Sequence, residues 1–384
     1  MLKSIRRHLH CHPEVSWNEF ETTAYIRSIL LQIPDIEILE LGLKTGLVAR
    51  LEGALAGDCI ALRADIDAIA LNEAWQTPCV SENPGIAHGC GHDFHTTCLI
   101  GAAQILSKQR HQLHGSVIFI FQPAEETTNG ACEVIRTGIF EKYGISAIFG
   151  LHNRPEIETG KVLVKTGGLM AAKLNFKVIV HGVGGHGSMP HKCVDPIVCA
   201  ASMVQNVLTI ASRNIDPMKS LVLSICSIHG GTPQNLVVDT VEMTGSMRWH
   251  DPEVGKRALE RLKTVIHATA ETFECHADFE IVESVHAVIN SPALEACALR
   301  AASAALGPHC LADSDSCLAT EDFAEYMQLV PGFFFWLGCR SPEETTAYPW
   351  HHAMFHVDDN ALEGGARLLA ECVHQYHQSQ TRCF

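Results

Sequence analysis

Short runs of apolar residues, each bounded by turn residues, recur in the first and last parts of the chain. They lie at Ile60–Leu62, Val117–Phe121, Ile145–Leu151 and Phe333–Leu337. Continuous rather than alternating runs are typical of strands that are buried on both faces, as in a parallel sheet. Apolar residues at helical spacing occur between and after these runs, at Cys98–Leu106 and Leu362–Val373. The alternation of strands and helices predicts an α/β domain with a mostly parallel sheet.

The middle of the chain has a different order of elements. A weakly alternating strand at Phe176–Val180 leads into a Gly-rich turn, and a helical pattern covers Ile197–Ile210. Two strands, a second helix and a last strand complete the block, at Leu221–Ile228, Val241–Met247, about Pro252 to Phe273, and Phe279–Val282. Strand-helix-strand-strand-helix-strand is the order of a split βαβ, or ferredoxin-like, sandwich.

The length of the chain is consistent with a small domain inserted into a larger one. At roughly 150 residues per domain, 384 residues predict two domains or three. We expect the larger α/β domain to comprise 1–171 and 285–384, and the smaller α+β domain to comprise 172–284. A single continuous sheet through the whole chain is the alternative.

Composition and charge narrow the classes of function. Lys and Arg number 28 against 43 Asp and Glu, so the net charge of −15 excludes nucleic acid and anionic membranes as partners. No apolar run of about 18 residues is present, and no apolar segment follows the basic N-terminus, which argues against a membrane span and a signal peptide. We therefore expect a cytosolic protein with reduced thiols. The 23 His residues make metal chemistry the first to look for.

Acidic, histidine and cysteine residues stand next to the apolar runs. Asp65 and Asp67 follow the first run, Glu125-Glu126 the second, and His152 the third, while His351-His352 stand beyond the fourth. A further segment with such residues, 88–93, precedes the helix at Cys98–Leu106. In open α/β sheets, ligands bind outside the carboxyl ends of the strands. These five segments therefore predict one site at that edge of the sheet.

The segment His88-Gly89-Cys90-Gly91-His92-Asp93 has the residue types of a metal site. Its glycines allow a tight turn, so that side chains two residues apart can face one site. Thiolate and imidazole are good ligands for Zn, Mn, Co or Ni. Asp93 can cap the following helix or hold a ligand from behind. A Gly-rich turn with an incidental Cys and His is the alternative.

Adjacent carboxylates at Glu125-Glu126 extend this interpretation. Neighbouring side chains on a turning chain point in different directions, so one carboxylate can bind a metal while the other faces a bound water. A carboxylate in that position is the usual general base of metal-assisted hydrolysis. A solvated acidic loop is the alternative.

A Gly-rich segment, Gly182-Val183-Gly184-Gly185-His186-Gly187, suggests a different class of protein, a dinucleotide-binding enzyme. That interpretation is weak, because Pro190 follows within three residues and no acidic residue stands about 20 residues further on. A turn that presents His186 explains the segment better. Serine hydrolase, P-loop and His-Glu-x-x-His motifs are absent from the sequence.

Together these segments resemble the aminoacylase/carboxypeptidase-like metallo-amidohydrolases, in particular the branch of hippurate hydrolase and the indole-acetyl-amino-acid hydrolases. The resemblance covers nearly the whole chain. Its most specific motifs are Cys-Gly-His-Asp at 90–93 and Gln-Pro-Ala-Glu-Glu at 122–126, and further matches lie at 6–14, 63–67, 150–155, 184–191, 230–232, 235, 321–323 and 350–355. It implies a metallopeptidase-like catalytic domain and an inserted lid domain that also serves dimerisation.

The resemblance also implies roles for individual residues. The metal ligands would be Cys90, His92, Glu126, His152 and His351, with Glu125 as the general acid/base. His186 would be a second catalytic residue, near the scissile carbonyl. Asn235 and Arg248 are candidates for holding the substrate carboxylate, and Asp67 and Asp93 would support the ligands. One departure concerns the last ligand: the family usually has Leu-His-His/Ser-Pro where this chain has Trp350-His351-His352-Ala353. His352 is therefore an alternative ligand.

The activity implied is metal-dependent hydrolysis of small N-acyl amino acids of the hippurate type. Two divalent ions per subunit are expected, Mn or Zn first, with Co or Ni as alternatives; the thiolate favours Zn and the resemblance favours Mn. A homodimer or homotetramer is expected, with Leu221–Ile228 as a candidate edge strand. The alternatives are a dipeptidase or an N-acetyl-diaminopimelate deacetylase of the same fold, and, in another class, a non-catalytic metal- or peptide-binding homologue.

Overall fold

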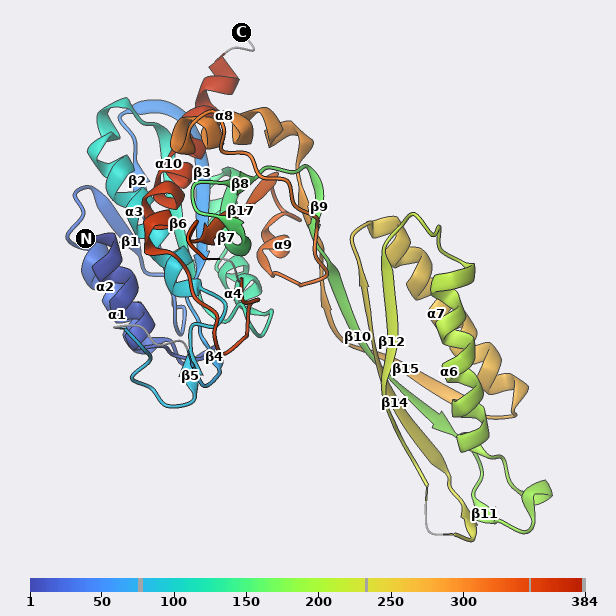
Figure 1. Cartoon of the computed structure of the whole chain (residues 1–384). Helices are drawn as coiled ribbons and strands as arrows, with labels where there is room; N and C mark the ends of the chain where they lie inside the picture. Colours follow the sequence, from blue (N-terminus) through green and yellow to red (C-terminus); the bar gives the residue numbers. More distant parts are fainter. Residues whose placement is uncertain (75–78, 232–233, 345–346, 382–384) are drawn as a thin grey trace. The chain divides into compact units, whose positions relative to one another are not determined.

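The computed structural model describes residues 1–74, 79–231, 234–344 and 347–381, and the chain divides into two compact units (Figure 1). The first unit comprises Met1–Gly167, Ile289–Asp315 and Asp322–Phe384. The second comprises Gly168–Val288 and the separate segment Ser316–Glu321. The insert expected at 172–284 falls inside the second unit, but Ser316–Glu321 belongs to that unit as well, although the sequence analysis assigned it to the larger domain.

A seven-stranded sheet in the order β1-β2-β6-β3-β7-β17-β8 forms the centre of the first unit. Its middle strands are parallel: β6 (His114–Gln122), β3 (Leu55–Asp65), β7 (Ile145–Glu158) and β17 (Gly332–Arg340). The outer strands are antiparallel: β1 (Ile36–Leu39), β2 (Leu47–Glu52) and β8 (Val162–Leu163). All four predicted apolar runs lie in the parallel centre, which confirms the α/β fold class. The antiparallel outer strands were not predicted.

Helices cover both faces of this sheet. Phe333 and Phe335 of β17 belong to a core that includes side chains of α1 (Leu2–Cys11), α3 (His92–Lys108), α8 (Glu295–Leu306) and α10 (Leu362–Thr381). Phe334 points to the opposite face, because side chains alternate along a strand, and its ring lies 4.6 Å from that of Phe323 in α9 (Phe323–Tyr326). The remaining helices of this unit are α2 (Phe20–Leu30), α4 (Gly130–Arg136) and α5 (Ile139–Tyr143).

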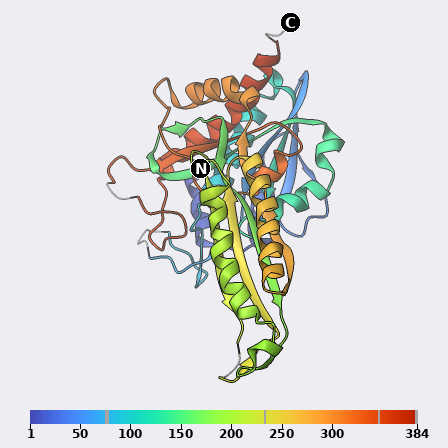
Figure 2. The same ribbon diagram turned by 90° about the vertical axis from the view of Figure 1, so that its right-hand side faces the viewer.

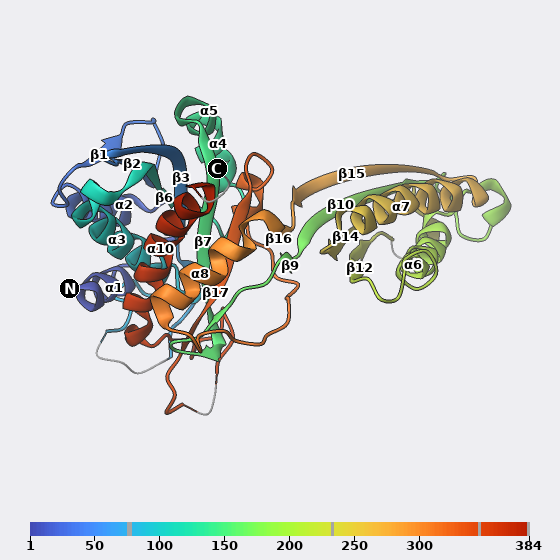
Figure 3. The ribbon, with the colours of Figure 1, turned by 90° about the horizontal axis from the view of Figure 1, so that it is seen from above.

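The second unit is a four-stranded antiparallel sheet with two helices side by side on one face (Figures 2 and 3). In sheet order the strands are β12 (Leu221–His229), β14 (Thr240–Trp249), β10 (Ala172–His181) and β15 (His276–Val285). The helices are α6 (Pro196–Arg213) and α7 (Pro252–Thr272). The side chains of Asp195 and Asp251 cap their N-termini by accepting first-turn amides. Element order and sheet order are those of a ferredoxin-like sandwich, with β12 at the sheet edge.

Shorter strands lie between these elements: β4 (Ile69–Ala70), β5 (Ile86–Ala87), β9 (Gly167–Met170), β11 (Gly185–His186), β13 (Leu236–Val237) and β16 (Val288–Asn290). Of the helices that the structure describes, none is long and apolar enough to cross a bilayer.

Candidate metal centre

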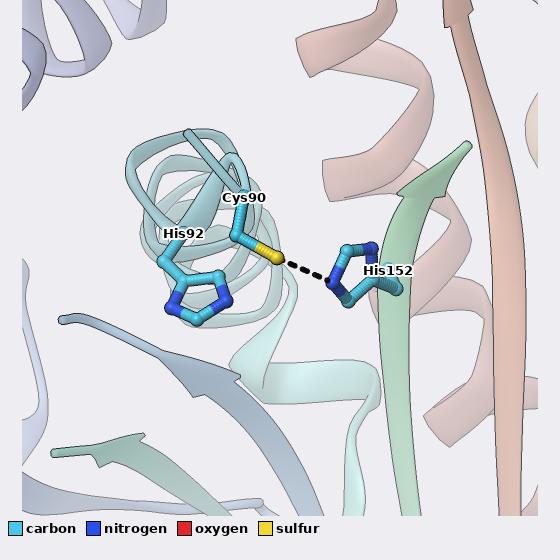
Figure 4. Close-up of side chains that lie close together, drawn as sticks. All are labelled: Cys90, His92 and His152. Carbon is cyan, nitrogen blue, oxygen red and sulfur yellow. Dashed lines mark hydrogen bonds between the residues drawn. The ribbon is translucent and has the colours of Figure 1, made fainter. Parts of the chain in front are cut away.

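Three of the predicted metal ligands converge in the first unit. Cys90 lies just before α3, His92 is the first residue of α3, and His152 lies on β7 (Figure 4). The thiol of Cys90 faces Nε2 of His152 at 3.4 Å. One potential ligand atom from each of the three side chains lies within 4.8 Å of the others. All three residues are buried.

Two more predicted ligands join this cluster. Cys90, Glu126 and His351 form a second group of ligand atoms within 4.8 Å of one another, and His92, Glu125 and Glu126 form a third. Nε2 of His351 lies 3.3 Å from Oε1 of Glu126. Because these groups share members, the six side chains form one continuous cluster.

The structure distinguishes between the two candidate histidines near the C-terminus. The side chain of His351 contacts Glu126, and its backbone has a positive φ of 63°. The ring of His352 instead stacks on Tyr348 at 4.9 Å, and its Nδ1 accepts a hydrogen bond from the amide of Met354. The geometry therefore brings His351, and not His352, to the cluster.

A glycine at position 91 makes the convergence of Cys90 and His92 sterically feasible. Gly91 has a φ of +87°, which residues with a Cβ rarely adopt. A Cβ at this position would also lie 2.3 Å from the side-chain nitrogen of Asn153. The tight turn lets Cys90 and His92 face the same pocket on either side of the glycine.

His152 is held as a neutral ring with Nε2 directed at the cluster. Its Nδ1 donates to the backbone oxygen of Asn153 at 2.8 Å, which fixes the tautomer. Burial, and then the nearby rings of His95 and His92, keep the pKa of His152 well below its usual value. The sequence analysis placed His152 after a strand, but β7 continues through it, because His152 pairs with Trp336 of β17.

The cluster concentrates negative charge in a buried pocket. Burial lowers the pKa of His92, but the carboxylates of Asp65, Asp67 and Glu126 outweigh it and raise that pKa to about 10. Burial, followed by the charges of Glu126 and Glu125, raises the pKa of the Cys90 thiol well above its usual value. Such an excess of carboxylates favours the binding of cations.

The arrangement fits a divalent metal ion. Nε2 of His92 is a buried atom with no hydrogen-bond partner among the described residues, and it lies 3.8 Å from carboxylate oxygens of both Glu125 and Glu126. A cation held by His92 and Glu126 would give this nitrogen a partner. Thiolate, imidazole and carboxylate are a donor set that Zn and neighbouring transition metals accept.

The two aspartates expected to support the ligands have different surroundings. Asp67 contacts Nδ1 of His92 at 3.1 Å, and its other oxygen accepts the amide of Glu126 at 3.0 Å. Asp67 thus touches two of the predicted ligands. Asp93 instead accepts from Nε of Arg6 at 2.8 Å and contacts Nδ1 of His10 at 2.9 Å, so it joins α1 to the start of α3.

His186, predicted to be catalytic, and the predicted substrate-binding residues Asn235 and Arg248 belong to the second unit. His186 is exposed on a two-residue strand, and its Nδ1 accepts from Ser188. Asn235 lies next to this strand, where its backbone oxygen accepts the amide of Gly187. Arg248 lies elsewhere in the unit, on β14, and donates to the backbone oxygen of Leu318 and to Thr320. Thr232, part of a segment that carried the resemblance, is outside the described residues.

Asn153 is a site residue that the sequence analysis did not single out. Its side-chain nitrogen donates to the backbone oxygen of Cys90 at 2.5 Å and contacts Nε2 of His95 at 2.9 Å. The indole nitrogen of Trp350 donates to both oxygens of Asn153 at 3.2 Å. The position of Asn153, directly after His152, was the available signal.

The chain is similar to known proteins over nearly its whole length. Residues 61–375 match the family described as Peptidase family M20/M25/M40. The chain is 39% identical over 371 residues to an N-acetylcysteine deacetylase of Bacillus subtilis, covering 96% of this chain and 95% of that protein. It is 32% identical over 371 residues to an N-acetyldiaminopimelate deacetylase of the same organism, covering 96% of each. Among solved structures, the Bacillus subtilis YXEP protein, described as a dinuclear metal binding peptidase from the M20 family, superposes with a TM-score of 0.86 at 36% identity, covering 98% of each chain.

Proposed function

This chain belongs to the M20/M25/M40 peptidase family, and from that premise we propose that it is a metal-dependent amidohydrolase that cleaves N-acyl amino acids. The products would be a carboxylic acid and a free amino acid. The observation that carries the proposal is that Glu125 and the five predicted ligands form one cluster. These ligands are Cys90, His92, Glu126, His152 and His351.

In this proposal the five ligands hold two divalent ions. The description of the YXEP relative as a dinuclear metal binding peptidase supports the number. Bound ions would lower the pKa of a water molecule and polarise the acyl oxygen of the substrate. Asp67 would fix the ring of His92 and the backbone of Glu126 through the hydrogen bonds described above.

Glu125 would act as the general base and then as the general acid. It is buried within the cluster, with one oxygen 3.8 Å from Nε2 of His92. Its carboxylate would take a proton from the attacking water and return a proton to the nitrogen of the leaving amino acid. The roles expected for His186, Asn235 and Arg248 stay predictions from the resemblance, as does a homodimer or homotetramer.

The relatives bear on the size of the acyl group. Two of them are named as deacetylases of N-acetyl amino acids, which favours a small acyl group such as acetyl. The benzoyl group of hippurate is a larger aromatic alternative within the same proposal.

A hydrolysis screen tests the proposed function. The full-length protein, freed of metal by chelation and reloaded with Mn, Co, Ni or Zn in turn, would be incubated with N-acetyl, N-benzoyl and long-acyl derivatives of several amino acids. Dipeptides and N-acetyl-diaminopimelate would be included in the same panel. We expect release of free amino acid from at least one N-acyl amino acid, and none from the metal-free protein. Metal-loaded protein that binds its ions but is inert across the panel would contradict the proposal and favour a non-catalytic binding role.

A further inference from the structure

The loop that carries Glu125 and Glu126, and the helix α4 that follows it, are held through their backbone by three carboxylates from distant parts of the chain. Glu19 accepts the amide of Ala124 at 2.8 Å, and Asp67 accepts the amide of Glu126 at 3.0 Å. Asp322 accepts the amide of Ala131, the second residue of α4, at 2.9 Å. Burying these carboxylates costs free energy, and the hydrogen bonds to backbone amides offset part of that cost.

Glu19 is the most unusual of the three. It immediately precedes α2, and its side chain is fully buried. Its second oxygen accepts the hydroxyl of Thr45 at 2.7 Å. The hydrogen bonds of this buried carboxylate to Ala124 and Thr45 therefore come from neutral donors, whereas Asp322 also accepts a hydrogen bond from the guanidinium of Arg63.

The residue that Glu19 holds is strained. Ala124 has a φ of +54°, in the left-handed region that favours glycine, and it directly precedes Glu125. Such a conformation persists only where the surroundings fix it. The orientation of the peptide at Ala124 sets the direction in which the next side chain, that of Glu125, leaves the backbone.

We propose that Glu19 is a positioning residue for Glu125, acting through the amide of Ala124. The inference rests on the proposed function, because it takes Glu125 as the general base. What Glu19 supplies is an acceptor at a fixed place, since the hydrogen bond to Ala124 requires an oxygen atom and a side chain of this length.

Two substitutions separate this role from general packing. Glu19→Gln keeps the side-chain length and an oxygen that can accept the amide of Ala124, while Glu19→Met has similar size and lacks that acceptor. We expect kcat to fall by about 10²-fold in Glu19→Met, with KM little changed, and to stay close to the wild-type value in Glu19→Gln. Hydrogen exchange followed by mass spectrometry should show lost protection of the peptide covering 122–131 in Glu19→Met only.

Glu14 provides the matched control. Its side chain accepts the amides of Glu21 and Thr22 at the start of the same helix, α2. Glu14→Met should lower the melting temperature, with no change in kcat or in exchange of the 122–131 peptide.

The outcomes distinguish the inference from the proposed function. If the wild-type enzyme is active and Glu19→Met keeps its kcat, the positioning role is wrong. Equal loss of kcat in Glu19→Gln and Glu19→Met would also overturn it, because the acceptor would not be what matters. If the wild-type protein hydrolyses nothing, the proposed function fails, whereas the exchange experiment still decides whether Glu19 fixes the loop.

Discussion

The indole of Trp350 meets the imidazole of His152 edge to face, with ring centroids 4.7 Å apart. The same indole donates its N–H to Asn153, and the guanidinium of Arg154 lies 4.8 Å from its centroid. Arg154 also lies 4.3 Å from the centroid of Trp336, so its cation is shared between two indoles. A stack of rings and one cation thus supports the ring of His152 from the side.

Replacing Trp350 by Leu should leave the orientation of the His152 ring less fixed. Loss of a group that orients a ligand typically lowers metal affinity about 10–100-fold, and we expect a value at the lower end, because the hydrogen bond from His152 to Asn153 is retained. Metal affinity would be measured by competition with a chromogenic chelator. Trp249→Phe, on β14 of the second unit, is the control and should leave the affinity unchanged. An unaltered affinity in Trp350→Leu would show that the stack is irrelevant to the metal centre.

Cys90 should be protected from alkylation by bound metal. A thiol coordinated as thiolate is blocked from attacking the reagent. In the metal-free protein, burial and the charges of Glu126 and Glu125 raise the pKa of Cys90, so its alkylation is slow and is followed at alkaline pH. The chain would be treated with iodoacetamide with and without added Zn or Mn, and modification at each cysteine would be counted by mass spectrometry. Cys226, which is exposed, serves as the internal control and should react equally in both states. Cys90 that is alkylated in the metal-free protein and to the same extent with metal present would contradict its assignment as a ligand.

Much of the fold was predictable because its strongest signals are local, either continuous apolar runs or apolar residues at strand or helix spacing. The four apolar runs of the first unit and the six elements of the second lie in the strands and helices of the structure. The outer strands β1, β2 and β8 were not predicted, because β1 and β8 are short and β2, at Leu47–Glu52, contains the charged residues Arg50 and Glu52. The segment Ser316–Glu321 could not be assigned to the second unit from its residues, since membership depends on contacts far along the chain.

The cluster of chemical groups was predictable for a similar reason. Cys, His and Glu side chains near strand ends and tight turns can be recognised in the sequence by their residue type. The residues that hold these side chains in place cannot. Asn153 and Glu19 act through hydrogen bonds to backbone atoms 63 and 105 residues away, and a bond to a backbone amide or carbonyl leaves no mark on the identity of the residue that supplies it.

The buried carboxyl of Glu19 should make the free energy of unfolding depend on pH. Burial raises the pKa of its carboxyl above the usual value, so the folded protein holds this proton more tightly than the unfolded chain. The resulting stabilisation is complete below the unfolded pKa, about 4.3, and is lost as pH rises through the folded pKa. Glu19→Gln has no such proton to lose. Its free energy of unfolding should therefore decline less than that of the wild type from about pH 4 to about pH 8, as measured by urea unfolding. Parallel curves for the two proteins would mean that Glu19 does not titrate differently on folding.

Glu125 and its neighbour Glu126 allow the sharpest test of the proposed chemistry, because the two carboxylates are adjacent and both lie within reach of His92. If Glu125 is the general base, Glu125→Gln should lower kcat by about 10²–10⁴-fold, the usual contribution of such a group. The content of bound metal, measured by elemental analysis after gel filtration, should stay at the wild-type value, since all five predicted ligands remain. Glu126→Gln should instead lower the content of bound metal, and the loss of activity should follow from the loss of metal. Ligand atoms of Glu125, Glu126 and His92 lie within 4.8 Å of one another, so either carboxylate is close enough to be the metal ligand. The two variants therefore test which carboxylate is the ligand and which is the base. Loss of metal from Glu125→Gln with retention in Glu126→Gln would make Glu125 the ligand and Glu126 the base.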